Sequence, residues 1–137
     1  MHVRKALPED LPRAVELART LGLDYSGMEG DDLWVAEGEG RVVGLVVLKK
    51  HADCLELCAL GVDPARRGKG IAKALVSALM AAASGDVHLA TVIPHFFETC
   101  GFKKTGKVPA TFPAKRKTPW CEGCDARLCT VMVRKVS

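Results

Sequence analysis

The order of apolar patterns along this chain predicts an α/β fold, with a mixed sheet and helices on its faces. Strand-like runs at 42–48 and 55–62 follow a glycine-rich hairpin signal. Segments with helical spacing separate these runs from further strands on either side. From 62 to 71 a strand leads through a glycine-studded turn straight into a helix. Elements in this order suit an α/β sheet, and 137 residues suit a single domain, 1–137.

The N-terminal half is expected to form one helix and three strands. Residues 2–5 have the composition of a short first strand. A helix should follow, because apolar residues recur at helical spacing between a proline and a glycine: Pro8, Leu11, Val15, Ala18, Leu21 and Gly22. Residues 23–31 are rich in Gly, Asp and Ser, and predict a loop or a broken short helix. Strands at 33–36 and 42–48 should be joined by a hairpin at 37–40.

The C-terminal half begins with the strand 55–62 and the glycine-studded turn. The helix behind this turn should present one apolar face, formed by Ile71, Leu75, Leu79 and Ala82. Residues 87–93 predict an inner strand, and Pro94 should open a short helix that ends at Gly101. Two more strands are expected, one from Phe102 and one at 130–136.

The composition excludes several classes of protein. Hydrophobic residues make up 48% and charged residues 26%, as in a globular protein with a packed core. No apolar run reaches the roughly 20 residues of a membrane span, and Pro8, Glu9 and Pro12 interrupt any signal peptide. A net charge of +4 and 5% aromatic residues argue against a nucleic-acid partner. We therefore expect a cytoplasmic protein, whose six cysteines are free thiols by default.

The turn after Val62 has the features of an anion-binding loop. Gly68 and Gly70 let the backbone approach a ligand closely, and the first N–H groups of the next helix point to the same place. Cations surround it: Arg66, Arg67 and Lys69. A Walker loop is excluded because no Ser or Thr follows Lys69, and the dinucleotide fingerprint lacks its third glycine. The sequence thus predicts an anion such as a diphosphate, held mainly by backbone amides.

The residues 67–72, Arg-Gly-Lys-Gly-Ile-Ala, resemble motif A of the GNAT acyl-CoA N-acyltransferases, with its pattern Arg/Gln-x-x-Gly-x-Gly/Ala. Residues 94–102, Pro-His-Phe-Phe-Glu-Thr-Cys-Gly-Phe, resemble a second block of that family. The resemblance implies the GNAT fold: a mostly antiparallel central sheet, helices on both faces, and two central strands that splay apart to admit acyl-CoA.

The resemblance also implies acetyl-CoA as co-substrate. Backbone groups of Leu60 and Val62 would contact the pantetheine arm and the thioester carbonyl. A backbone N–H there would donate a hydrogen bond to the oxyanion of the tetrahedral intermediate. The coenzyme-binding residues implied are Leu60, Gly61, Val62, Arg66, Arg67, Gly68, Lys69, Gly70, Ile71, Ala72 and Phe97. Many family members carry a Tyr acid at the position of Phe97, so a two-residue acid–base mechanism is not expected here.

Glu56 is the catalytic candidate, because it is the only carboxylate within the central strand pattern. A partly buried carboxylate can serve as a base, through water, although a strand-end Glu in an ion pair is the plainer interpretation. His88 and His95 are near in sequence, and a solvated loop histidine is the plain interpretation of His95.

The segment Phe97 to Arg134 resembles the short N-acetylglutamate-synthase-like branch, and also the arsenic-resistance acetyltransferases. Both imply a small substrate that presents an α-amino group beside a carboxylate. Six basic residues could supply the cation that this carboxylate requires: Lys103, Lys104, Lys107, Lys115, Arg116 and Lys117. A solvated basic face, or contact with the 3′-phosphate of the coenzyme, explains this set equally well.

Three further questions stay open. The Cys-x-x-Cys pair Cys121 and Cys124, with Cys129, has zinc-ligand spacing but lacks a second pair, so reduced or redox-sensitive thiols are the main interpretation. The alternatives to a small-molecule acetyltransferase are a protein lysine or N-terminal acetyltransferase and a non-catalytic acyl-CoA sensor. A homodimer is also open.

Overall fold

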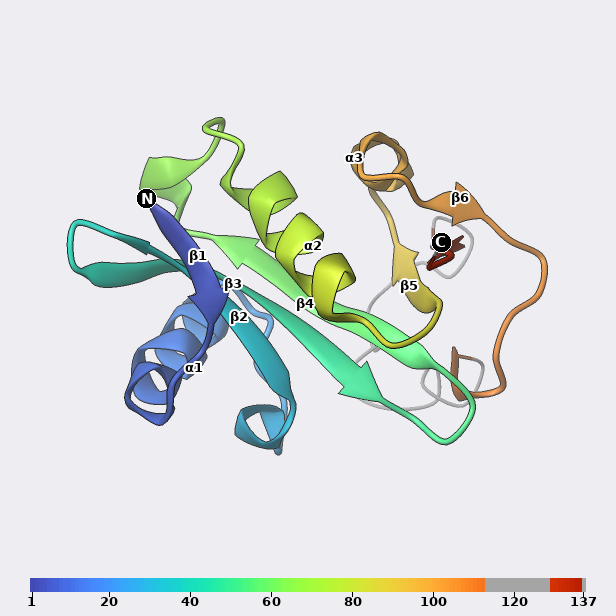
Figure 1. Ribbon diagram of the computed structural model, residues 1–137, viewed down its shortest axis with the longest axis horizontal. Helices are drawn as coiled ribbons and strands as arrows, with labels where there is room; N and C mark the ends of the chain where they lie inside the picture. Colours follow the sequence, from blue (N-terminus) through green and yellow to red (C-terminus); the bar gives the residue numbers. More distant parts are fainter. Residues whose placement is uncertain (113–128, 137) are drawn as a thin grey trace. The chain divides into compact units, whose positions relative to one another are not determined.

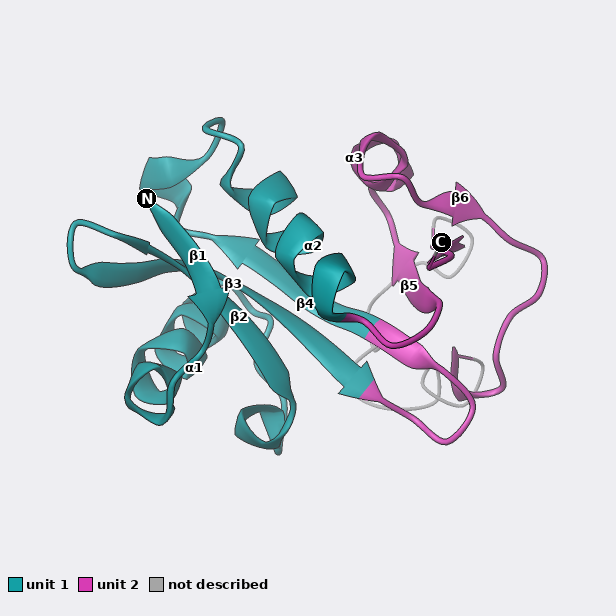
Figure 2. Ribbon diagram, in the orientation of Figure 1, with its two compact units in different colours: residues 1–49, 57–82 teal, residues 50–56, 83–137 magenta. Residues whose placement is uncertain are grey.

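The computed structural model describes residues 1–112 and 129–136. They form two compact units, residues 1–49 with 57–82 (unit 1) and residues 50–56 with 83–137 (unit 2) (Figure 2). Strand order along the sheet is β1-β2-β3-β4-β5-β7-β6. β1–β2, β2–β3, β5–β7 and β6–β7 pair antiparallel and β4–β5 pairs parallel, so the expected mixed and mostly antiparallel sheet is confirmed.

Unit 1 holds the N-terminal strands and the two longer helices (Figure 1). Its elements are β1 (His2–Lys5), η1 (Pro8–Asp10), α1 (Leu11–Thr20), η2 (Met28–Gly30), β2 (Asp32–Gly38), β3 (Arg41–Lys50), β4 (Leu55–Val62), η3 (Pro64–Arg66) and α2 (Ile71–Ala82). The first two residues of β4 and the last of β3 belong to unit 2. The predicted strands and helices are confirmed here, and the broken short helix expected within 23–31 is η2.

The two helices of unit 1 cover opposite faces of its strands. A Cβ atom on Gly44 would lie 3.1 Å from Leu75 Cδ1 and 3.3 Å from Ile71 Cγ2, so this face of β3 meets α2. The next residue, Leu45, is fully buried in a cluster that includes Ala14 of α1. Because successive strand residues point to opposite faces, α1 and α2 lie on opposite sides, as predicted.

Two ion pairs anchor the start of the chain to unit 1. Arg4 on β1 pairs with Asp10 at 2.5 Å and with Glu37 on β2 at 3.3 Å. The same Asp10 carboxylate accepts the N–H of Leu7 at 2.7 Å, which closes the turn before α1. Gly22, with φ +72°, ends this helix segment in the left-handed conformation that glycine adopts most readily.

In the part of unit 2 that the structure describes, the main elements are a small group of strands and the helix α3. Its elements are β5 (Val87–Thr91), α3 (Pro94–Thr99), β6 (Lys103–Lys104) and β7 (Thr130–Arg134). β5 pairs in parallel with β4 at Leu55–Val87 and Glu56–His88, and antiparallel with β7, which also pairs with β6. The prediction of β5 as an inner strand is therefore confirmed.

Two strands of unit 2 are shorter than predicted. β5 ends at Thr91 rather than 93, because the Thr91 hydroxyl accepts the N–H of Ile93 at 3.0 Å and turns the chain before Pro94. β7 ends at Arg134 rather than 136, and the N–H of Val136 bonds to Asp86 instead. The splaying of the two central strands involves residues of both units and stays a prediction, as does the single domain over 1–137.

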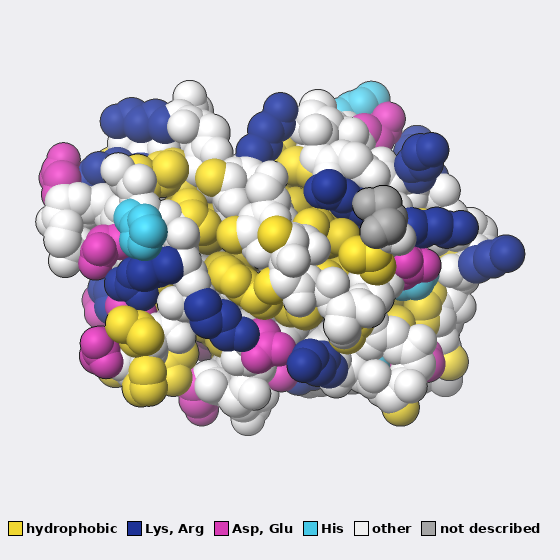
Figure 3. Space-filling view, viewed as in Figure 1, with side chains coloured by type: hydrophobic (Ala, Val, Ile, Leu, Met, Phe, Trp, Pro, Cys, Tyr) yellow, Lys and Arg dark blue, Asp and Glu magenta, His cyan; other side chains and the backbone are white. Residues whose placement is uncertain are grey.

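Membrane-spanning helices were also sought. Among the described residues, none of the helices combines the length and the apolar character that crossing a bilayer requires. On the face seen in Figure 3, Lys and Arg side chains lie apart from one another, among acidic and apolar ones.

Candidate functional site

The loop after β4 adopts the conformation expected of an anion cradle. Asp63 accepts the N–H of Ala65 at 3.0 Å and starts the turn. Gly68 and Gly70 have φ values of +82° and +77°, and a Cβ atom on either would meet nothing within 4 Å. α2 begins directly afterwards, with the N–H of Ala74 bonded to Gly70 O as its first internal bond. Its first-turn N–H groups consequently stand without intrahelical partners beside an open loop.

The three cations of this loop have different surroundings. Arg66 forms an ion pair with Glu39 in the β2–β3 turn, at 2.9 Å, and its side chain is only 18% exposed. Arg67 donates from Nε to the carbonyl oxygen of Val62 at 3.3 Å. Lys69 is exposed. Two of the cations thus hold the loop to the rest of unit 1, which is a role that sequence reasoning did not assign to them.

The other coenzyme candidates of unit 1 lie along β4 and at the start of α2. Gly61 and Val62 are buried and Leu60 is half-buried, while Ile71 is buried and Ala72 half-buried in the first turn of the helix. A Cβ atom on Gly61 would lie 2.7 Å from the side-chain ends of Leu21 and Leu23, so the backbone of β4 lies close to the segment that follows α1. Their backbone role toward the thioester stays a prediction.

Phe97 belongs to the core of unit 2. It is 5% exposed and packs edge-on against Phe96 and Phe102, with ring centroids 5.0 and 5.8 Å apart. The N–H of Phe102 bonds back to Phe97 O across Gly101, whose φ is +89°, so the predicted glycine cap is confirmed. The position of this ring favours a packing role, and its contact with the coenzyme stays a prediction.

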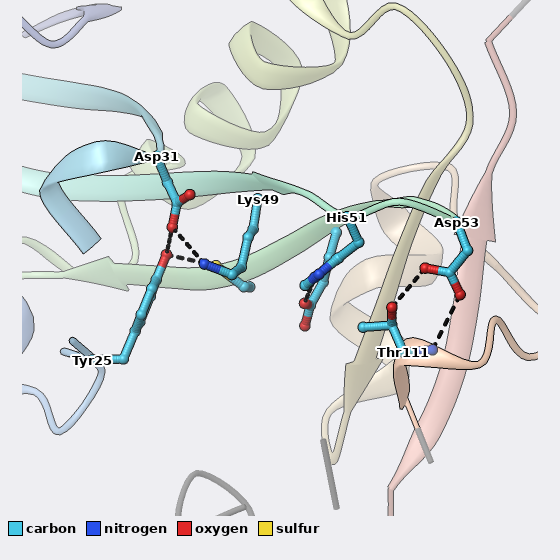
Figure 4. A network of polar contacts seen from close by, with 8 residues as sticks. Tyr25, Asp31, Lys49, His51, Asp53 and Thr111 are labelled. Carbon is cyan, nitrogen blue, oxygen red and sulfur yellow. Dashed lines mark hydrogen bonds and ion pairs between the residues drawn. The ribbon is translucent and has the colours of Figure 1, made fainter. Parts of the chain in front are cut away.

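Glu56, the candidate base, is buried and paired with a histidine that sequence reasoning did not single out. The carboxylate is 2% exposed, and Oε1 lies 2.7 Å from Nε2 of His51 (Figure 4). His51 stands at the β3–β4 turn, where its N–H donates to Cys54 O at 2.8 Å, and its side chain is 18% exposed. Glu56 thus has a close polar partner, with which it forms an ion pair only when His51 is protonated, and its role as a base stays a prediction.

His88 lies next to Glu56 across the parallel pairing of β4 and β5. Register partners in neighbouring strands present their side chains on the same face of a sheet, so both groups share one face of unit 2. Nδ1 of His88 is buried and has no hydrogen-bond partner, and its ring packs near Phe112 with centroids 6.4 Å apart. The neighbouring Thr111 bonds twice to Asp53, at 2.6 Å and 3.1 Å (Figure 4).

Unit 1 contains a second polar cluster, centred on Tyr25. The phenol lies 2.5 Å from Asp31 and 3.2 Å from the Cys58 sulfur, and Lys49 pairs with the same carboxylate at 3.1 Å (Figure 4). Burial, together with the bond to Asp31, raises the pKa of Tyr25 far above its ordinary value. This phenol therefore stays protonated at any physiological pH and serves as a hydrogen-bond donor.

The remaining candidates are exposed or lie outside the described residues. The His95 side chain is 97% exposed, as expected for a solvated loop histidine. Lys103, Lys104 and Lys107 are exposed, whereas Lys115, Arg116, Lys117, Cys121 and Cys124 lie outside the described residues. Cys129 is half-buried and forms no disulfide, and the described part of the chain holds no group of three or more ligands suited to a metal ion.

Two features escaped sequence reasoning: His51 and the Tyr25 cluster. The hairpin turn at 51–54 is the only sequence signal for His51, because it returns the chain toward Glu56. Which way each side chain points depends on the turn geometry, and a one-dimensional pattern does not contain it.

Comparison with known proteins identifies a family. A profile of the acetyltransferase (GNAT) domain matches residues 29–104, more than half of the chain. The N-acetylaspartate synthetase of Danio rerio is 32% identical over 107 residues, covering 69% of this chain and 38% of that protein. N-acetyltransferase 8 of Mus musculus is 35% identical over 98 residues, covering 61% of this chain and 43% of that protein. The chain thus spans less than half the length of these relatives.

Solved structures share the fold. The N-acetylglutamate synthase from Neisseria gonorrhoeae, complexed with coenzyme A and N-acetyl-glutamate, superposes with a TM-score of 0.80 at 21% identity, over 99% of this chain and 35% of that one. Rv2747 from Mycobacterium tuberculosis, in complex with CoA, gives a TM-score of 0.75 at 24% identity and covers both chains completely, 100% of each.

Proposed function

This chain belongs to the GNAT acetyltransferase family, and we propose that it transfers the acetyl group of acetyl-CoA to the amine of a small, amino-acid-like substrate. The observation that carries the proposal is the loop after β4. Two glycines with positive φ, an open space above them and the unpaired N–H groups of α2 form a receptor for a diphosphate. Coenzyme A carries such a diphosphate.

The coenzyme site of the proposal comprises the backbone of β4 and the loop. Its residues are Leu60, Gly61, Val62, Arg66, Arg67, Gly68, Lys69, Gly70, Ile71 and Ala72, and the proposal adds Phe97, the buried residue of α3. Because Arg66 and Arg67 are engaged within unit 1, their contribution is to hold the loop in shape, and backbone amides carry most of the phosphate binding. Lys69 supplies the exposed positive charge.

In the proposed reaction, the free amine attacks the thioester carbonyl, and a backbone N–H of β4 stabilises the oxyanion that forms. The C–N bond forms and the C–S bond breaks, which releases coenzyme A. Before attack, the ammonium must lose a proton, and the hydrogen-bonded pair of Glu56 and His51 receives it. The ring of Phe97 carries no acidic proton, so the thiolate obtains its proton from the reacting amine or from water.

An acidic amino acid is the proposed acceptor. The relatives named N-acetylaspartate synthetase, and the similar fold of an N-acetylglutamate synthase bound to N-acetyl-glutamate, support an α-amine beside carboxylates. Exposed cations of unit 2 suit such a substrate: Lys103, Lys104 and Lys107. A cytoplasmic location, where acetyl-CoA is available and thiols stay reduced, completes the proposal.

The test combines binding and turnover with the purified chain. Acetyl-CoA is titrated by calorimetry, and thiol release is then followed with L-glutamate, L-aspartate, L-glutamine, L-alanine and a lysine-containing peptide. N-acetyl-L-glutamate, whose α-amine is blocked, is the matched control. We expect the highest kcat/KM for the dicarboxylic amino acids and no turnover of the control.

The other outcomes separate the alternatives. Turnover of the peptide alone would identify a protein acetyltransferase, and binding without turnover of any amine would identify an acyl-CoA sensor. Failure to bind acetyl-CoA would overturn the assignment of the loop itself.

A further inference from the structure

The pairing of His51 with Glu56 has the geometry of a catalytic dyad. The carboxylate is 2% exposed, whereas the histidine side chain that it contacts at 2.7 Å is 18% exposed. A proton that arrives at this buried carboxylate has a direct route to solvent through the imidazole. The histidine is therefore the member of the pair that can exchange protons with its surroundings.

The contact also determines which ring nitrogen is basic. A carboxylate accepts hydrogen bonds, so Glu56 favours the tautomer in which Nε2 of His51 carries the proton and donates it. Nδ1 is then left with a lone pair. Imidazoles as a class titrate nearer to neutral pH than carboxylates do, and a base works best when it titrates near the operating pH.

The surroundings of the pair provide a place for a polar molecule. His88 lies on the same sheet face as Glu56, and its buried Nδ1 finds no hydrogen-bond partner among residues 1–112 and 129–136. An unpaired buried polar atom at a native site calls for a water or a ligand group. Among the described residues, two titratable groups of the β3–β4 turn also lie near, Cys54 and Asp53. Burial, Asp53 and the charge of Glu56 raise the pKa of Cys54 to about 11. The Asp53 carboxylate accepts a hydrogen bond from the Thr111 hydroxyl.

We propose that His51 is the proton acceptor of the acetyl transfer, and that Glu56 is the positioning carboxylate that orients its ring and fixes its tautomer. This inference rests on the proposed acetyltransferase function.

The protons balance as follows. The incoming ammonium has three N–H bonds. One proton passes through a water to Nδ1 of His51, the second stays on the amide nitrogen, and the third reaches the departing thiolate. Nε2–H remains bonded to Glu56 throughout. His51, whose side chain is 18% exposed, then releases its proton to solvent.

The experiment compares His51→Gln and Glu56→Gln with the wild type over a range of pH, using whichever amine the wild type turns over. We expect His51→Gln to lower kcat by a factor on the order of 100 or more while the KM for acetyl-CoA changes less than about twofold. The rise of kcat/KM with pH should disappear in His51→Gln. In Glu56→Gln the rise should persist with a lower kcat, because the imidazole remains but loses the hydrogen bond that orients its ring.

The reverse result would overturn the inference: a pH limb that persists in His51→Gln and disappears in Glu56→Gln makes Glu56 itself the base. His2→Gln is the control for removal of a histidine, because His2 is exposed on β1. For His51→Ala, added imidazole should restore part of the rate, which a merely structural role would not allow.

A measurement independent of activity separates this inference from the proposed function. Long-range ¹H–¹⁵N NMR spectra report the tautomer of His51, which should be Nε2–H in the wild type and lose that preference in Glu56→Gln. If the wild type acetylates no amine, the proposed function fails. An Nδ1–H tautomer of His51 overturns the dyad in either case.

Discussion

Replacing Gly70 with alanine should weaken coenzyme binding and leave the fold intact. Gly70 has φ +77°, a conformation that costs a residue with a Cβ atom about 1–2 kcal/mol. The added Cβ would meet no atom of the chain within 4 Å, so no clash adds to this strain. The exposed loop can relieve it by moving to negative φ, which disperses the amides that form the cradle.

The magnitude of the affinity loss follows from that strain. Binding must restore the left-handed conformation, so the lost free energy of about 1–2 kcal/mol corresponds to a roughly 5- to 30-fold increase in Kd. A contact between the new methyl group and a phosphate would add to this increase. Because the loop relaxes when empty, the midpoint of thermal unfolding should change by only a few degrees.

Isothermal titration of acetyl-CoA into the wild type, Gly70→Ala and Gly22→Ala is the assay. Gly22 is a matched control: its φ is +72°, its Cβ would also meet nothing within 4 Å, and it lies at the end of α1 rather than in the loop. Gly22→Ala carries the same backbone strain and should bind acetyl-CoA as the wild type does. An unchanged Kd for Gly70→Ala, or an equal loss in both variants, would refute the assignment of this loop to the coenzyme.

Three further variants test the fold around the site. Asp10→Asn should lose about 1–3 kcal/mol of unfolding free energy in urea titrations near neutral pH, because it breaks charge-assisted bonds. The hydrogen bond from Arg4 holds the pKa of Asp10 below its ordinary value. The stability that Asp10 contributes is therefore complete above its pKa in the unfolded chain and is lost as pH falls through its pKa in the folded protein. In strong acid, the unfolding free energy of Asp10→Asn should equal that of the wild type. Gly44→Ala places a methyl group 3.1 Å from a leucine of α2 and should cost about 1–3 kcal/mol, whereas an unchanged urea midpoint would mean that α2 moves away freely. Asp53→Ala removes both bonds to Thr111 and should speed hydrogen exchange of the Thr111 amide by mass spectrometry, a change that would be absent if these bonds do not hold the segment.

Much of the fold could be predicted because its signals are local. The glycine turns at 68–70 and 101, the helical spacing of α1 and α2, and the strand pattern of β4 all depend on residues close together in the chain. The ends of β5 and β7 were misjudged, because a Thr91 hydroxyl and an Asp86 carboxylate capture backbone N–H groups that apolar composition alone assigns to strands.

The site was predicted only in part. Arg66 was assigned to the phosphate from its position in the loop, but the structure pairs it with Glu39 of the β2–β3 turn. The aromatic packing of Phe97 also appears only when Phe102 folds back across the glycine cap. In each case a residue outside the loop motif contacts a side chain that the resemblance assigns to the coenzyme, and the motif contains no information about that contact.

The sequence by itself determined most of the secondary structure, the glycine turn after β4 and the family, because backbone preferences and motif spacing are properties of neighbouring residues. Tertiary structure decided which charges meet. Glu56 was a lone carboxylate in a strand until the β3–β4 turn brought His51 within 2.7 Å of it. Charge pairing depends on distance and burial, so the proton acceptor that we propose for this site can be identified only in the folded chain.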